Sequence, residues 1–170
     1  MTEPLTLTKL IILYMLNQVD FSLTKSQIFD FILEKEYTNY FTLQQATGEL
    51  TDSGLIETKA LHSRTLLSIN DKGRNTLKFF KGRISDGIKE DIAKYFEDNK
   101  VRIHNEVSVM SNYYRTEAGE YLADLSANEH SSEILHLQIV MPTEEAAEAI
   151  CENWKKQCSD IYSYLLEKLL

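Results

Sequence analysis

The sequence has 170 residues, of which 43% are hydrophobic and 26% are charged, a composition typical of folded globular proteins and not of disordered or collagen-like chains. Lys and Arg number 18 against 26 Asp and Glu, so the formal net charge is −8 and the pI is about 5.0. Indiscriminate binding to nucleic acid or to an anionic membrane needs a basic surface, and this balance argues against both.

The charge is unevenly distributed along the chain. Residues 1–83 carry ten Lys/Arg and nine Asp/Glu, a net +1, whereas residues 84–170 carry eight and seventeen, a net −9. Within the first half, residues 57–83 hold seven basic residues against two acidic ones, a net +5. The excess acid therefore belongs to the second half, and one short segment of the first half is locally basic.

Three helices are predicted before any strand. Apolar residues at three- and four-residue spacing predict a first helix over residues 5–18. Thr24 and Gln27 have the order of a capping box, which places the start of a second helix near residue 25, and we expect it to extend to residue 35. A third periodic stretch, around residues 43–50, is followed by a glycine suited to a helix end.

A β-hairpin and a fourth helix follow. Residues 55–60 and 65–70 are rich in β-branched and apolar residues and read as two strands joined by a polar tip. Either Asn70 or Asp71 can cap the next helix, which ends or is interrupted at Gly82.

The second half combines a bridging helix, a sheet and a long helix. Ser85 is a suitable cap for a fifth helix, which we expect to bridge two domains. Alternating patterns then predict three antiparallel strands, over residues 103–115, 120–127 and 132–141. Thr143 caps a final helix that continues to the last residues of the chain.

A basic hairpin directly after a short third helix is the layout of a winged helix-turn-helix domain. In that fold the third helix enters the DNA major groove and the hairpin, or wing, touches phosphates. We therefore predict an α+β protein with a winged-helix domain over residues 1–82. Residues 83–170 would form a dimerisation or sensing module with a linker helix, a three-stranded antiparallel sheet and a long C-terminal helix.

The same region resembles a known group of regulators. Residues 43–56 (LQQATGELTDSGLI) and 67–74 (LSINDKGR) resemble the "L…L…GLI…LT.KGR" spine of PadR-like and MarR-like winged-helix transcriptional regulators. With Asn39-Tyr40-Phe41 ahead of that spine, the chain is closer still to an uncharacterised bacterial winged-helix family with an acidic C-terminal half. The resemblance implies the winged-helix fold over about residues 5–80 and a role in transcription regulation.

The third helix offers candidate base contacts. With Leu43 buried, the 100° step per residue turns Phe41, Gln45, Gly48 and Asp52 outward. A Gln amide can pair bidentately with adenine, although solvated polar residues on an exposed helix are the alternative. The residues predicted to contact base edges are Thr38, Asn39, Gln44 and Gln45.

The basic segment offers candidate contacts to the DNA backbone, with a plain solvated face as the alternative. Phosphates are bound mainly by Lys and Arg, and six neutralised phosphates would give a salt slope of about −5. The residues predicted to contact the backbone are Lys59, His62, Arg64, Lys72, Arg74 and Lys78.

The final helix carries an apolar seam with alternating spacings of four and three. A helix of this length is longer than a three-stranded sheet needs as cover, and we therefore expect a homodimer; the alternative is that the whole seam covers the chain's own sheet. The predicted dimer-interface residues are Cys151, Trp154, Cys158, Ile161 and Leu165. The two cysteines lie about 10 Å apart along the helix axis, too far for a disulfide, so we expect reduced, buried thiols.

No signal for an enzyme, a metal or a membrane segment is found in the sequence. Catalytic motifs are missing, the four histidines lack metal-ligand spacing, and no apolar run reaches the ~18 to 20 residues of a membrane span. The N-terminus also lacks the pattern of a secretory signal, so we expect a cytoplasmic protein without a cofactor or catalytic residues. A small-molecule effector pocket is a further hypothesis, with the strand residues Tyr113, Tyr114, Tyr121, His104 and His136 as its lining.

The function predicted from these features is a dimeric transcriptional regulator that binds double-stranded DNA. The alternative is a winged helix used as a protein-interaction module without specific DNA binding. The alternative is favoured by the third helix, since no Lys or Arg occurs between Lys35 and Lys59.

Overall fold

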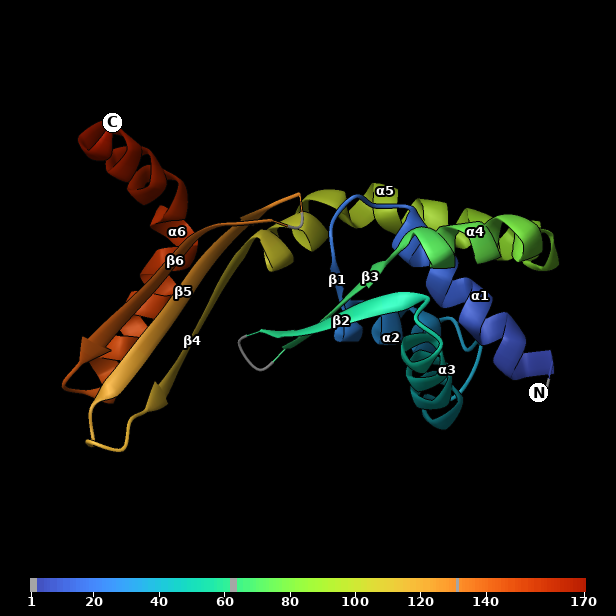
Figure 1. Cartoon of the computed structure of the whole chain (residues 1–170), viewed down its shortest axis with the longest axis horizontal. Coiled ribbons are helices and arrows are strands. Elements are labelled where there is room, and N and C mark those ends of the chain that lie inside the picture. Colours follow the sequence, from blue (N-terminus) through green and yellow to red (C-terminus); the bar gives the residue numbers. More distant parts are fainter. Residues whose placement is uncertain (1–2, 62–63, 131) are drawn as a thin grey trace. The chain divides into compact units, whose positions relative to one another are not determined.

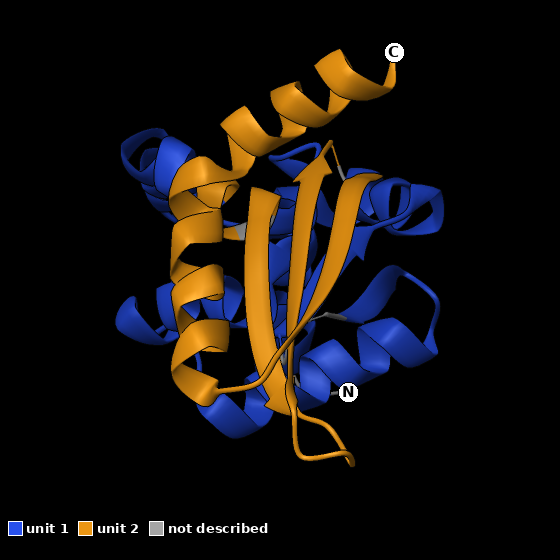
Figure 2. Ribbon diagram, turned by 90° about the vertical axis from the view of Figure 1, so that its left-hand side faces the viewer, with its two compact units in different colours: residues 1–103 blue, residues 104–170 orange. Residues whose placement is uncertain are grey.

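The computed structural model describes residues 3–61, 64–130 and 132–170 of the chain (Figure 1). It is an α+β structure with two compact units, residues 1–103 and 104–170, coloured separately in Figure 2. The expected boundary after residue 82 lies earlier than this division because Ile84, Ile92 and Ile103 are buried in the core of the first unit. Among the residues described, no helix combines the length and the apolar content that a membrane crossing requires.

Along the chain, the first unit alternates helices with the strands of a small sheet. Its elements are α1 (Glu3–Asn17), β1 (Leu23–Thr24), α2 (Lys25–Glu34), α3 (Tyr40–Asp52), β2 (Ile56–Leu61), β3 (Arg64–Ile69), α4 (Asp71–Phe80), the 3₁₀ turn η1 (Lys81–Arg83) and α5 (Asp86–Ser108), whose last residues lie beyond Ile103. The three predicted N-terminal helices, the hairpin strands and the fourth helix are confirmed within about three residues at each end.

Side-chain caps fix where three of these helices begin. The predicted capping box is confirmed. The backbone N–H of Gln27 donates to Thr24 Oγ1 over 3.1 Å, and the backbone N–H of Thr24 donates to Gln27 Oε1 over 2.9 Å. Asn39 Oδ1 accepts from the Thr42 N–H over 2.9 Å and so caps α3. Of the two candidates for α4, Asn70 is the cap, since its Oδ1 accepts from the Gly73 N–H.

The sheet of the first unit has the order β1-β3-β2 and is antiparallel throughout. Ile56 pairs with Ile69 at one end of the hairpin, and Leu61 pairs with Arg64 at the other. Strand β1 has only two residues, with Leu23 opposite Leu67, and was not predicted because two residues are too few to show an alternating pattern.

The core of the first unit is built on α1, which is buried on most of its surface. Ile11, Ile12 and Met15 are at most 1% exposed. Against α1 packs α3, through Leu43, Ala46 and Leu50 among others. The predicted inward face of α3 is therefore confirmed.

The prediction of a strand beginning at residue 103 is wrong, because α5 continues to Ser108 and β4 begins only at Val109. Ile103 is completely buried in the same core as Ile92, and the spacing of eleven residues returns a side chain to the same side of an α-helix after three turns. Core packing therefore keeps this segment helical although its sequence alternates.

Gly73 is expected to tolerate no larger side chain. A Cβ at this position would lie 2.1 Å from the Leu55 carbonyl oxygen and 2.8 Å from Ile69 Cγ1. Since the oxygen belongs to the backbone, Gly73→Ala should destabilise the first unit by about 1–3 kcal/mol, measured by chemical denaturation. Gly48, with open space around its Cβ position in α3, is the control: Gly48→Ala should stabilise by about 0.5–1 kcal/mol. Equal stability of Gly73→Ala and the wild type would contradict the close packing of α4.

The second unit is a three-stranded antiparallel sheet with one long helix. Strands β4 (Val109–Arg115), β5 (Tyr121–Glu129) and β6 (Ser132–Met141) follow each other in space as in sequence, and α6 (Glu144–Leu169) is capped by Thr143 as predicted. Figure 2 shows α6 along one face of the sheet, with its last turns extending past the strands. The predicted end of the middle strand at residue 127 is wrong, because β5 continues through a bulge at Ala127/Asn128 to Glu129.

The core of the second unit lies between β5 and α6. Ala123, Leu125 and Ala127 of the sheet form one cluster with Cys151, Trp154 and Cys158 of the helix. These three helix residues, predicted as a dimer interface, are therefore buried against the chain's own sheet; Ile161 packs at the edge of the cluster, and Leu165 is half-buried. Both cysteines are free and buried, as predicted, and burial raises the pKa of each thiol.

Candidate functional site

The outer face of α3 is exposed along the length of the helix. Phe41 is 84% exposed, and Gln45, Gly48 and Asp52 are exposed along the same side of the helix, as predicted. Of the other predicted base contacts, Thr38 is half-buried ahead of the helix, and the Asn39 side-chain oxygen is occupied by its capping bond.

The two adjacent glutamines of α3 have different surroundings. Gln44 is half-buried: its Oε1 accepts from Lys25 Nζ over 2.6 Å, and its Nε2 donates to the Tyr40 hydroxyl over 2.6 Å. Gln45 is exposed, and its Nε2 donates to Glu49 Oε1 over 2.9 Å. Gln44 is thus tied to its neighbours at both ends of its amide, whereas Gln45 is tied at one.

Lys25, in the first turn of α2, is a candidate contact that the sequence interpretation missed. Its ammonium lies 5.1 Å from the centre of the Phe29 ring and donates to Gln44, so α2 and α3 are joined beside the start of α3. The capping box at Thr24 and Gln27 was the available signal, because it fixes Lys25 as the first residue of the helix.

A groove of about 330 Å³ lies next to Lys25 and joins three elements of the first unit. Its walls come from α2 and the residue before it, the start of α3 and the hairpin strand β3. The residues that line it are Thr24, Lys25, Ser26, Phe29, Asp30, Leu33, Tyr40, Arg64 and Thr65.

The β2–β3 hairpin presents two of the predicted contacts on one face. Lys59 and Arg64 are both exposed, and the pairing of Lys59 with Leu66 and of Leu61 with Arg64 puts the two on the same face of the hairpin, since side chains two residues apart point the same way. His62, also predicted to contact the DNA backbone, lies outside the described residues.

None of the three predicted contacts on α4 lines the groove beside Lys25. Figure 1 shows α4 and the body of α3 on opposite sides of α1. Lys72 Nζ donates to the Ser53 carbonyl over 2.7 Å, and Arg74 pairs with Asp71 over 3.1 Å, while Lys78 is exposed. Lys72 is thus bound at the C-terminal end of α3, whereas Arg74 is paired within α4.

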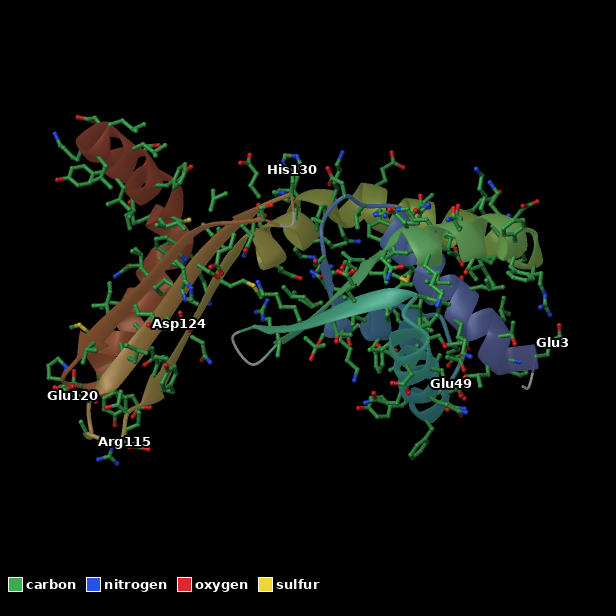
Figure 3. All side chains as sticks on the ribbon, in the orientation of Figure 1. Glu3, Glu49, Arg115, Glu120, Asp124 and His130 are labelled. Carbon is green, nitrogen blue, oxygen red and sulfur yellow. The ribbon has the colours of Figure 1, made fainter. Side chains whose placement is uncertain are left out.

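Glu49, labelled in Figure 3, is the acidic residue of α3 that lies closest to Gln45. Its second carboxylate oxygen, Oε2, forms an ion pair with Lys9 Nζ of α1, whose side chain is only 15% exposed. The hydrogen bonds from Lys9 and Gln45 lower the pKa of the Glu49 carboxyl group. The ammonium group of Lys9 on α1 thus compensates the negative charge of Glu49 on α3.

The residues proposed for an effector pocket do not converge in the second unit. Tyr113 and Tyr114 are neighbours on β4 and so lie on opposite faces of the sheet, and His104 is in α5, not in a strand. Throughout the described ranges, no three His, Cys, Asp or Glu side chains are grouped so that they could hold a metal ion.

His136 lies between two acidic side chains of the second unit. Its Nε2 pairs with Asp124 on the neighbouring strand, and its Nδ1 lies 3.3 Å from Glu133 Oε1. The hydrogen bond to Asp124 raises the pKa of His136 above its ordinary value of 6.5, against the opposing effect of burial.

This raised pKa gives a testable pH dependence. A group with a raised folded-state pKa stabilises the fold fully below its unfolded value, here about 6.5, and the contribution is lost as the pH rises through the folded pKa. Chemical denaturation of the wild type and of His136→Gln should therefore show a larger difference at about pH 6 than at about pH 9. A difference that grows with pH would contradict the pairing.

The chain matches a protein-family model over most of its length. Residues 8–169 match the family described as a domain of unknown function (DUF4364), and the protein belongs to this family. Comparison with curated proteins found no match, nor did comparison with solved structures.

Proposed function

We propose that the first unit is a winged-helix domain and that the protein is a dimeric transcriptional regulator that binds double-stranded DNA. Support comes from the order of its elements, in which three helices precede an antiparallel hairpin and a short strand completes the sheet in the order β1-β3-β2. In this assignment α3 is the recognition helix and β2–β3 is the wing.

The groove beside Lys25 is the observation that carries the proposal. It brings the start of α2, the start of α3 and the wing strand to one place, with Lys25 on one side and Arg64 on another. A phosphate there would meet Lys25 and Arg64 near the positive end of the α2 dipole, with Asp30 as the one carboxylate of the lining. A recognition helix needs such backbone contacts at its side to fix its register on the duplex.

The acidic net charge is compatible with this function because the charges on the proposed interface are arranged locally. Glu49 is paired with Lys9, and Lys59 and Arg64 are exposed on the same face of the hairpin. Attraction to phosphate depends on the local field within about 10 Å at 0.1 M salt, not on the sum over the chain. Lys25, Lys59 and Arg64 are therefore the proposed phosphate contacts of each protomer.

The dimer places two recognition helices in successive major grooves, about 34 Å apart. With Cys151, Trp154 and Cys158 buried, the surface available to a second copy on α6 is its last part, where Tyr164, Leu166 and Leu169 are 58%, 42% and 78% exposed. The proposal includes no enzymatic activity and no cofactor, and it places the protein in the cytoplasm with its DNA.

Selection of bound duplexes from a random DNA library tests the function. The purified protein should enrich a palindromic motif with half-sites about 10 base pairs apart, and the affinity should fall steeply with salt. Absence of enrichment at low salt would overturn the proposal.

A second function, a winged helix that binds a protein partner, is favoured by one observation. The stretch between Lys35 and Lys59, which includes all of α3, has no Lys or Arg, and Asp52 is exposed on its outer face. A protein-interaction module would show no enriched DNA motif in the same selection, so one experiment separates the two functions.

A further inference from the structure

The two glutamines on α3 differ in exposure and in how many ends of the amide are held: Gln44 is half-buried, and Gln45 is exposed. Both ends of the Gln44 amide are occupied, by Lys25 and by Tyr40. In Gln45 the amide nitrogen uses one of its two hydrogens for Glu49, and Oε1 has no partner among the described residues. Because Gln45 is exposed, its Oε1 and its second N–H are both accessible to a base.

Glu49 determines which way the Gln45 amide points. An ionised carboxylate only accepts hydrogen bonds, so it can hold the NH₂ end of the amide and not its oxygen. Residues four apart on a helix lie one above the other, which puts Glu49 one turn after Gln45 on the same side of α3. With the nitrogen held there, the oxygen of Gln45 is directed away from Glu49.

Lys9 holds Glu49 in turn. Its ammonium pairs with Oε2 and leaves Oε1 for Gln45, so the two oxygens of one carboxylate link α1 to the outer face of α3. Lys9 belongs to α1, and the next two residues of this helix, Leu10 and Ile11, are 4% and 1% exposed. The chain Lys9–Glu49–Gln45 thus begins in a well-packed part of the unit and ends at an exposed amide.

We propose that Gln45 is the base-reading residue of α3, that Lys9 and Glu49 are positioning residues for its amide, and that Gln44 ties α3 to α2. In this arrangement Gln45 Oε1 accepts from adenine N6, and the remaining N–H donates to adenine N7, the pairing that Gln makes with adenine in the major groove. The inference rests on the proposed DNA-binding function and adds to it the identity of the base and the origin of the selectivity.

The first test uses the wild-type protein and modified DNA. In the selected site, each adenine of one half-site is replaced in turn by 7-deazaadenine, which lacks the N7 acceptor, and the Kd is measured by fluorescence anisotropy. One position should show a loss of about fivefold or more, and Gln45→Ala should abolish the sensitivity at that position alone. Equal affinity for every modified duplex would overturn the inference while leaving the DNA-binding function intact.

The second test asks whether Lys9 acts through Gln45. Lys9→Met keeps the aliphatic part of the side chain and removes the charge, and its preference for adenine at the sensitive position should fall about tenfold. Lys9→Arg, which can still pair with Glu49, should restore the preference for adenine. Lys156→Met, an equal charge change at an exposed position of α6, should leave this preference unchanged. A Lys9→Met protein that binds with wild-type preference would overturn the positioning role.

The outcomes of the two tests remain distinct from failure of the proposed function. A wild-type protein that enriches no sequence removes the DNA-binding function, and with it the inference. A wild type that enriches a motif in which neither Gln45→Ala nor 7-deazaadenine has an effect removes only the inference. Should Lys9→Met be too unstable to assay, Glu49→Gln provides the same test, since its amide can hold Gln45 by either end.

Discussion

Replacing Lys25, Lys59 and Arg64 together with Ala is expected to weaken binding to every duplex alike and to remove most of its salt dependence. Each cation that neutralises a phosphate contributes about 0.9 to the slope of log K against log salt concentration. A dimer with three such contacts in each protomer has a slope of about −5, and the triple variant should bring this slope close to zero. Fluorescence anisotropy with the selected duplex, titrated from low to moderate salt, measures both quantities.

The α4 residues provide a control with the same change in charge. Lys72→Ala, Arg74→Ala and Lys78→Ala remove three cations from α4, none of which lines the groove beside Lys25, so the slope should stay close to that of the wild type. If this second triple variant loses as much of the slope as the first, the DNA lies against α4 and not against α3 and the wing. A loss confined to one DNA sequence would also contradict the assignment of Lys25, Lys59 and Arg64 to phosphates.

Trp154→Ala should unfold the second unit at moderate denaturant concentration. The indole is 1% exposed between α6 and the sheet, and its Nε1 donates to the Ser126 carbonyl over 3.1 Å. Truncation creates a large cavity and leaves a buried carbonyl without that donor, a loss of about 3–5 kcal/mol. This loss is large because the free energy of unfolding of a unit of 67 residues is itself only about 5–10 kcal/mol.

The measurement follows circular dichroism during urea denaturation of the full chain. The second unit should unfold at a much lower urea concentration in the variant, while a transition from the first unit stays in place. Leu169→Ala, at a position 78% exposed on the same helix, should change stability by less than about 0.5 kcal/mol. A Trp154→Ala protein as stable as Leu169→Ala would contradict the packing of α6 on its own sheet.

Local sequence patterns predicted the elements that local interactions form. The Thr24–Gln27 capping box, the Asn70 cap and the Thr143 cap each satisfy free N–H groups with a side chain three residues away or less, so a short stretch of sequence contains all that is needed. The inward face of α3 followed from the helical period alone, because Leu43 and the residues one turn later point the same way.

Patterns failed where distant packing decided the outcome. Residues 103–108 alternate as a strand would, yet burial of Ile103 with Ile92 keeps them in α5. The seam of α6 resembles a dimerisation helix, and the same residues serve equally well to cover a sheet; only the position of Ala123 and Leu125 opposite Trp154 shows which surface is buried. Periodicity reports that a face is apolar and does not identify its partner.

The sequence predicted only some residues of the candidate site, because distant packing brings the others to it. Gln44, Gln45, Lys59 and Arg64 stood out by residue type, whereas Lys25 and Lys9 did not, since each acts on a residue many positions away. The basic segment from residue 57 to 83 is continuous in sequence, but the fold divides it between the wing and α4.

The sequence by itself determined the class of fold, the helix starts and the separation of a near-neutral first half from an acidic second half, because these depend on neighbours along the chain. The tertiary structure decided which side chains meet: Lys9 with Glu49, Lys25 with Gln44, and Lys25 with Arg64 at one groove. Electrostatic and hydrogen-bonding energies depend on distances in space, and residues 40 positions apart come within hydrogen-bonding reach only when the core has packed.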